Sequence, residues 1–207
     1  MNNGIAVLGG SFDPVHLGHI LTATDIQNTF HFKELIFMPC GQAVFKNQLK
    51  ANPQQRLDML KLALENYPHF KIDAREIQRQ GPSYTILSLE ELRKEYSEPI
   101  TWILGEDAFQ SFHQWHQYQN ILKLAHLIIL ARPDQQKPYA PELLELLKEH
   151  QTQNIDDLNL AFGKIYCYPH SDYPYSSTAI RQNLLNHVKP EGLNPKVLAF
   201  INKNHCY

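Results

Sequence analysis

The chain has 207 residues, of which 43% are apolar and 19% are charged, and its net charge is −2 with histidine neutral. These values are typical of a globular protein with one sizeable core, and they lack the basic excess that favours binding to nucleic acid. The cysteines Cys40, Cys167 and Cys206 are far apart and odd in number, which favours a reducing compartment over a disulfide framework. No signal peptide or membrane span is recognisable, so we expect a cytoplasmic protein without a membrane partner.

Taken in chain order, short apolar runs alternate with segments of helical periodicity. Strands are predicted at residues 4–8, 35–38, 69–73, 100–104, 126–130 and 165–168. Helices are predicted at residues 17–29, 85–96, 107–112, 117–124, 141–150 and 176–186, and from residues 53 and 195 onward. The alternation predicts an α/β fold, a Rossmann-like doubly wound parallel sheet with helices on both faces. We expect a single domain over residues 1–207, with the helices of residues 176–205 completing the site and the polar residues 151–159 as an insertion.

The turn between the first strand and the first helix, residues 9–19, reads Gly-Gly-Ser-Phe-Asp-Pro-Val-His-Leu-Gly-His. Gly9 and Gly10 allow the backbone to pass close to a bulky group. His16 and His19 are three residues apart at the start of the helix, so their rings share one face. The free N–H groups and positive dipole end of a helix N-terminus suit a polyphosphate, as do imidazoles that donate or carry charge. Metal binding by this pair is the alternative, although no further ligand cluster lies nearby at zinc spacing.

Further candidates directly follow the later strands, where a sheet of this type binds its ligand. Gly105 and Asp107 come after the fourth predicted strand, and a carboxylate there can accept hydrogen bonds from ribose hydroxyls or complement a helix dipole. Glu106, between them, is expected to be solvated. Arg132 follows the fifth predicted strand, as a phosphate ligand or as a surface arginine.

A second motif, Ser-Ser-Thr-Ala-Ile-Arg, occupies residues 176–181 at the start of a predicted helix. The hydroxyl group of Ser176 or Ser177 is expected to cap the free N–H groups of this helix, and the same N–H groups bind anions. Arg181 lies one turn into the helix, where a guanidinium can hold a phosphate through two hydrogen bonds. A plain helix cap with a solvated arginine is the alternative interpretation.

Residues 9–19 resemble the GG-(S/T)-F-D-P-x-H-x-G-H motif of the HxGH nucleotidyltransferase superfamily. The histidine at position 16 resembles that of bacterial nicotinate-nucleotide adenylyltransferases, whereas pantetheine-phosphate adenylyltransferases usually have threonine there. Residues 176–181 are similar to the (I/V)-S-(S/A)-T-x-I-R motif of that family, with Tyr175 in place of the branched residue. Residues 105–107 resemble its G-x-D element and residues 81–85 its (A/G)-x-S-Y-T segment. The resemblance covers nearly the whole chain.

The resemblance implies adenylyl transfer from ATP to nicotinate mononucleotide, a step of NAD biosynthesis that gives deamido-NAD and pyrophosphate. It implies Mg²⁺ bound to ATP, without a dedicated protein cage, and it leaves monomer and homodimer open. The catalytic residues that it implies are His16, His19, Lys46 and Arg181. The ATP site that it implies comprises Gly9, Gly10, Ser11, Phe12, His16, Gly18, His19, Gly105, Asp107, Ser177, Thr178 and Arg181. The mononucleotide site that it implies comprises Ser11, Lys46, Tyr84, Thr85, Trp115 and Arg132.

One segment departs from the family pattern. The family usually has P-P-H-(K/R) after the second strand, where this chain has Ala-Val-Phe-Lys at residues 43–46. Lys46 keeps a cation, but Phe45 replaces the histidine, so contacts of that histidine cannot be transferred to this chain. Three alternatives remain. A related transferase would act on nicotinamide mononucleotide or phosphopantetheine. A dinucleotide-binding oxidoreductase would be expected to have GxGxxG, which is absent here. A non-catalytic nucleotide sensor is favoured only by Phe45.

Overall fold

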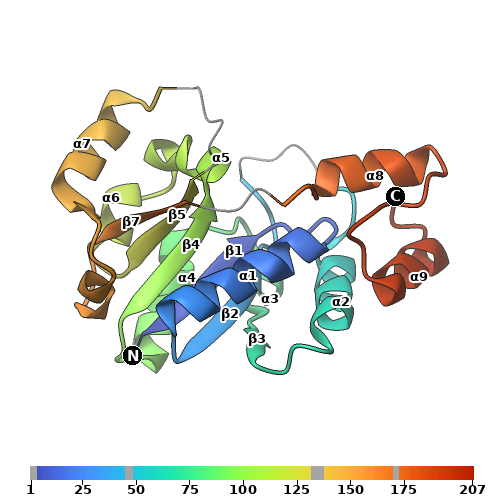
Figure 1. Cartoon of the computed structure of the whole chain (residues 1–207), viewed down its shortest axis with the longest axis horizontal. Coiled ribbons are helices and arrows are strands. Elements are labelled where there is room, and N and C mark those ends of the chain that lie inside the picture. The colour runs from blue at the N-terminus through green and yellow to red at the C-terminus, as the bar shows by residue number, and fades with distance from the viewer. Residues whose placement is uncertain (1–3, 45–48, 132–137, 170–172) are drawn as a thin grey trace.

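The computed structural model describes residues 4–44, 49–131, 138–169 and 173–207 (Figure 1). The catalytic and binding candidates Lys46 and Arg132, and the replaced histidine position Phe45, lie outside the described residues. The strands in the described part are β1 (Ile5–Gly10), β2 (Glu34–Pro39), β3 (Phe70–Ile72), β4 (Ile100–Gly105), β5 (His126–Ala131), β6 (Gln151–Thr152) and β7 (Ile165–Pro169).

These strands form one sheet in the order β3-β2-β1-β4-β5-β7-β6, and every pairing in it is parallel. The predicted doubly wound parallel sheet is therefore confirmed, and all six predicted strands are present to within two residues at each end. β1 and β4 are neighbours in the sheet although two strands separate them in the chain. The strand order reverses between them, and a sheet of this kind binds its ligand at the carboxyl ends of such strands.

The helices also follow the predicted order. They are α1 (Leu17–Phe30), α2 (Pro53–Leu64), α3 (Arg75–Gln78), α4 (Thr85–Glu95), α5 (Glu106–Phe109), α6 (Tyr118–Ile121), α7 (Pro141–His150), α8 (Ser177–Leu185) and α9 (Pro195–Asn204), with 3-10 turns at Phe112–Gln114 and Ile155–Asn159. The side chains of Asn52 and Asn194 cap α2 and α9, each of which has proline at its first position. This is the start signal that the sequence contains.

Three short elements differ from the prediction. The helix predicted at residues 107–112 is divided into α5 and the turn Phe112–Gln114, and α3 was not predicted. Residues 151–159 are not an insertion, because β6 pairs with β7 and Leu158 is fully buried in the core. Elements of two to five residues are too short to show the periodicity on which the prediction rests.

Each face of the sheet is covered by its own layer of apolar side chains. The helices α1, α2 and α9 pack on one face, where Ile26, Leu60 and Val197 are buried. The helices α4 to α7 pack on the other face, where Leu89 and Leu143 are buried. Figure 1 shows α1 lying across the sheet, with α7 at one end of the molecule and α8 and α9 at the other.

Packing within the protein leaves no room for a side chain at position 9. A Cβ atom built at Gly9 would lie 2.6 Å from Cζ2 of Trp102, and one built at Gly10 would lie 2.9 Å from Cζ of Phe12. The bulky groups that the two glycines allow the backbone to approach are therefore side chains of this chain.

We expect Gly9→Ala to lower the free energy of unfolding by about 1–3 kcal/mol, because the added methyl group overpacks a buried strand against Trp102. Urea denaturation of the purified variant measures this loss. Gly105→Ala is the matched control, because nothing lies within 4 Å of a Cβ atom there. Gly105→Ala should lower the free energy of unfolding by less than about 1 kcal/mol, which is the usual effect of changing a helix cap. Equal losses in the two variants would contradict the packing argument.

Candidate active site

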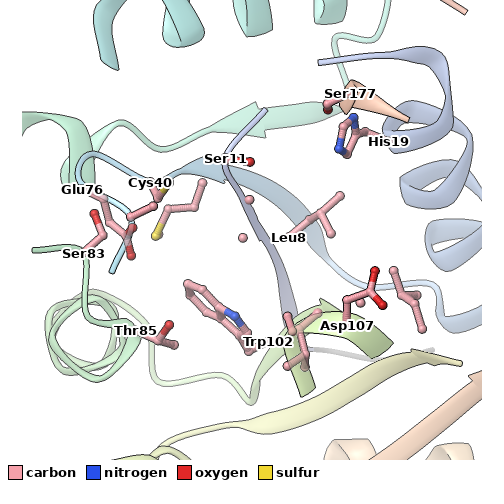
Figure 2. A pocket seen from close by; sticks show the side chains of 18 of the residues that line it. Leu8, Ser11, His19, Cys40, Glu76, Ser83, Thr85, Trp102, Asp107 and Ser177 are labelled. Atoms are coloured by element: carbon pink, nitrogen blue, oxygen red, sulfur yellow. The ribbon is translucent and has the colours of Figure 1, made fainter. Parts of the chain in front are cut away.

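A cavity of about 550 Å³ lies at the carboxyl ends of β1, β2 and β4. Residues of the β1–α1 turn, of the segments after β2 and β4, and of the stretch before α8 line it. Figure 2 shows Cys40 beside Glu76 and Ser83, Ser11 near the centre of the view, His19 near Ser177, and Asp107 on the side opposite Glu76. The cavity thus occupies the edge of the sheet at which the order reverses, as this fold requires of a ligand site.

Most of the predicted site residues that the structure describes line this one cavity. They are Gly9, Gly10, Ser11, His16, Gly18, His19, Tyr84, Thr85, Gly105, Asp107, Trp115 and Ser177. Phe12, Thr178 and Arg181 do not line it. Phe12 is only 1% exposed and its ring packs against Phe37 and His19, so it belongs to the core beneath the cavity.

The two motif histidines face each other across 3.7 Å between ring centroids, which confirms that they share one face of α1. The backbone N–H of His16 donates to Nδ1 of His19 at 3.2 Å. In the neutral ring of His19 the proton therefore sits on Nε2, where it can be donated to an anion. This hydrogen bond fixes the tautomer before any substrate arrives.

His16 is 7% exposed, and its Nδ1 atom has no hydrogen-bond partner in the described part of the chain. Burial lowers the pKa of His16 from 6.5 to about 4. At neutral pH the ring is therefore uncharged in the free protein, and the expected positive contribution of His16 must come from a hydrogen bond instead. Position 16 is thus a neutral polar group placed at the edge of the cavity.

Arg181 and Ser177 connect α8 to the β1–α1 turn. Nη1 of Arg181 donates to the carbonyl oxygen of Asp13 at 2.6 Å, and Oγ of Ser177 donates to the carbonyl oxygen of Pro14 at 2.9 Å. Nη2 of Arg181 donates to Thr178 at 3.2 Å. The helix cap predicted for this motif is made by Ser176, whose Oγ accepts from the backbone N–H of Ala179. Arg181 thus holds the turn that carries the histidines.

The prediction that Glu106 is solvated is wrong. Its side chain is 3% exposed and accepts a hydrogen bond from the hydroxyl of Tyr139. Burial and this carboxylate raise the pKa of Tyr139. Tyr139 packs edge-on against Phe109 of α5, so the segment before α7 covers the short helix on which Asp107 stands. The sequence could not show this, because Glu106 and Tyr139 are far apart in the chain.

Several cavity residues were not recognised as site residues in the sequence, and Trp102 and Glu76 are among them. Trp102 lies on β4 and faces the cavity, whereas the sequence indicated only a strand residue. Glu76 lies on the unpredicted α3, is buried, and accepts from Oγ of Ser88 at 2.6 Å. Burial raises the pKa of Glu76. Oγ of Ser83 accepts from the backbone N–H of Gly41 at 2.8 Å, which joins the segment before α4 to the segment after β2.

Trp115 supports the predicted stacking role by its position. It is half-buried at the cavity, its ring packs on Phe112, and its buried Nε1 atom has no hydrogen-bond partner in the described residues. Tyr84 lies beside His116, with 4.5 Å between the ring centroids. Aromatic faces therefore gather at the part of the cavity formed by the segment before α4 and the turn after α5.

Within the described ranges, no three His, Cys, Asp or Glu side chains converge in a way that could hold a metal ion. The alternative that this histidine pair binds a metal ion is therefore not supported by a third ligand from that part of the chain. Over the same ranges, no helix is long and apolar enough to cross a membrane.

We expect NMR titration of histidine-labelled protein to show His16 with a midpoint near 4, assigned by the signal missing from His16→Gln. Between pH 6.5 and 4 the unfolded chain binds a proton at this residue that the folded chain does not. His16 therefore lowers the stability of the fold progressively as the pH falls through that range, and leaves it unchanged above it. A His16 midpoint at or above 6.5 would contradict the neutral ring.

Comparison with known proteins agrees with this geometry. Residues 7–183 match the model of the cytidylyltransferase-like family. A protein named probable nicotinate-nucleotide adenylyltransferase from Legionella pneumophila is 39% identical to the chain, over 99% of this chain and 99% of its own length. A protein of the same name from Psychromonas ingrahamii is also 39% identical, over 98% of this chain and 96% of its own length. The nicotinic acid mononucleotide adenylyltransferase of Plasmodium falciparum, solved in complex with NaAD, shares the fold with a TM-score of 0.69 at 20% identity, covering 99% of this chain and 97% of that one. The chain belongs to the cytidylyltransferase-like family and, within it, to the nicotinate-nucleotide adenylyltransferases.

Proposed function

We propose that this protein transfers the adenylyl group of ATP to nicotinate mononucleotide and releases pyrophosphate, giving nicotinate adenine dinucleotide, the deamido form of NAD. The observation that carries this proposal is the shared cavity. It brings His16 and His19 of the β1–α1 turn together with Asp107 on one side and Tyr84 and Trp115 on another. A transferase of this kind needs a polyphosphate site between two nucleoside sites. The sequence relatives carry the same activity in their names.

The reaction requires positioning more than proton transfer. A phosphate oxygen of the mononucleotide attacks the α-phosphorus of ATP, the bond from that phosphorus to the bridging oxygen breaks, and pyrophosphate leaves with the electron pair. The attacking phosphate has its second pKa near ~6, so it is mostly dianionic at neutral pH and needs no general base. Catalysis then depends on holding the two anions in line and on stabilising the charge of the leaving group.

His19 suits the stabilising role because its neutral tautomer carries the proton on Nε2. His16 contributes as an uncharged group, because burial lowers its pKa. Lys46 remains a proposed cation for the phosphates, and Arg132 a proposed ligand of the mononucleotide phosphate, since neither lies in the described part of the chain. Arg181 would reach the triphosphate only by exchanging its present bond to the carbonyl of Asp13.

The two nucleosides would occupy opposite sides of the cavity. On the adenosine side we place Gly105, Asp107 and Ser177, with the carboxylate of Asp107 accepting from ribose hydroxyls. On the pyridine side we place Tyr84, Thr85 and Trp115, with the indole face stacked on the ring. Residues 9–11 lie between the two groups, where the phosphates would meet.

Mg²⁺ enters this proposal as part of the substrate MgATP, where it neutralises the leaving pyrophosphate. We further propose a cytoplasmic location, supported by the three cysteines, all of which are free thiols in the structure. Both a monomer and a homodimer are compatible with the proposed site, because every residue assigned to it comes from this one chain.

The direct test is pyrophosphate release from MgATP with nicotinate mononucleotide and nicotinamide mononucleotide assayed in parallel. We expect at least a tenfold higher kcat/KM with the acid. Equal use of both would indicate a dual-specificity enzyme. Absence of release with either, from protein that still binds ATP, would reject the transferase function and favour a nucleotide sensor.

We expect His16→Ala and His19→Ala each to lower kcat by about 10²–10³, the usual cost of removing one electrostatic donor from such a site. Circular dichroism should show that both variants stay folded. His69→Ala is the matched control, because His69 is exposed and precedes β3 at the other end of the sheet. If either motif variant stays within threefold of the parent enzyme, that histidine does not have the proposed role.

A further inference from the structure

Arg56 is a buried cation that the proposed mechanism does not use. It stands on α2, its side chain is 0% exposed, and no carboxylate of the described residues pairs with it. Nη1 donates to the carbonyl oxygen of Ser11 at 2.7 Å and Nη2 to that of Gly41 at 2.8 Å. Its Nε atom is buried without a partner. Glu76, the buried carboxylate on the same wall of the cavity, accepts a hydrogen bond from Ser88 instead of pairing with Arg56.

Such an arrangement is costly for the fold. A guanidinium removed from water normally has an ionised partner, and two neutral carbonyl groups compensate for its charge only in part. An apolar side chain of similar length would fill the same space without that cost. A buried positive charge without a direct ion pair is, however, one that would stabilise an anionic ligand bound nearby.

The guanidinium lies directly behind the wall of the cavity. Ser11 and Cys40, both cavity residues, are contacted by the same nitrogen, with Nη1 at 3.7 Å from Sγ of Cys40. Phe12 has a positive φ of 47°, a conformation that costs energy outside glycine and has to be held in place.

We propose that Arg56 is a positioning residue that also supplies the positive potential for the phosphate of the acceptor mononucleotide. By holding the carbonyl of Ser11 it fixes the backbone of this cavity residue, and its charge acts on the phosphate through one layer of backbone. This inference rests on the proposed function and identifies the phosphate site of that function.

The acceptor phosphate is favoured over the triphosphate of ATP by position. The carbonyl and thiol that Arg56 contacts in Gly41 and Cys40 follow β2, and Ser83 binds this segment from the side of Tyr84. Figure 2 shows Cys40 next to Glu76 and Ser83, with Asp107 on the other side of the view. The cation thus stands behind the pyridine side of the cavity.

The test compares two ligands that differ only in the phosphate. Calorimetry gives the dissociation constants of nicotinate riboside and nicotinate mononucleotide. The riboside constant divided by the mononucleotide constant measures what the phosphate contributes to binding. We expect Arg56→Met to lower this ratio at least tenfold, with less than a twofold change for the riboside. Equal weakening of both ligands would mean that Arg56 supports the fold alone, and an unchanged ratio would mean that its charge does not act on the phosphate.

Arg56→Lys provides a second variant that keeps the buried charge and reaches only one of the two carbonyls. We expect its ratio to fall two- to fivefold, with the riboside again changed less than twofold, so the inference can fail on this variant even if Arg56→Met does not fold. Equal loss for both ligands, or no loss in the ratio, would overturn it.

Arg93→Met is the matched control, because Arg93 also holds backbone carbonyls, those of Glu98, Leu124 and Ala161, and it does not line the cavity. The ratio of the two dissociation constants for Arg93→Met should equal that of the parent protein, although the melting temperature of this variant should fall. A drop in the ratio of the size seen with Arg56→Met would show a general effect of losing a carbonyl-binding arginine. A parent protein that binds neither ligand would reject the proposed function and this inference together, whereas a parent with normal binding isolates the role of Arg56.

Discussion

The site depends on one buried carboxylate, that of Asp13 in the β1–α1 turn. Oδ1 accepts from the hydroxyl of Tyr207 at 2.8 Å and from the backbone N–H of Ala51 at 3.1 Å, and Oδ2 accepts from the N–H of Lys50 at 2.9 Å. Arg181 binds the carbonyl oxygen of the same residue. The turn with the two histidines, the segment before α2, the helix α8 and the residue at position 207 therefore meet at one point. Hydrogen bonds to an ionised group are stronger than neutral ones, so these four distant segments hold one another in register.

The charges of the site are arranged around neutral groups. The rings nearest the expected phosphates include that of His16, which burial keeps uncharged, and His19 receives a backbone hydrogen bond that orients its proton. Two permanent cations of the described residues stand farther back, with Arg56 behind the wall of the cavity and Arg181 on the turn. Preorganised dipoles at the point of reaction and charges behind them stabilise an anion without binding it so tightly that the product is retained.

The sequence allowed the sheet and the long helices to be predicted, because each depends on local patterns, and most of the predicted site residues that the structure describes line the cavity. Strand runs, the caps Asn52 and Asn194, and the position of residues after strands all come from neighbours in the chain. The elements that escaped prediction depend on contacts between distant residues. Glu106 is buried because Tyr139 covers it, and Gly9 is fixed by Trp102 across the sheet. The charge state of His16 likewise follows from burial, which a motif does not reveal.

Arg56 shows why such features are hard to read from a sequence even when a family is recognised. It stands in the first turn of α2, next to glutamines and after the cap Asn52 and the proline at the first helical position, where an arginine would ordinarily be expected to be solvated. Only the packing of α2 under the β1–α1 turn turns this side chain inward, onto carbonyl groups of two segments that line or adjoin the cavity. The motif supplies the groups that face the substrate, whereas the rigidity of that motif comes from helices that begin far from it in the chain. A physical account of specificity in this fold therefore has to include the layer behind the cavity wall, where Asp13 and Arg56 hold the same turn by opposite charges.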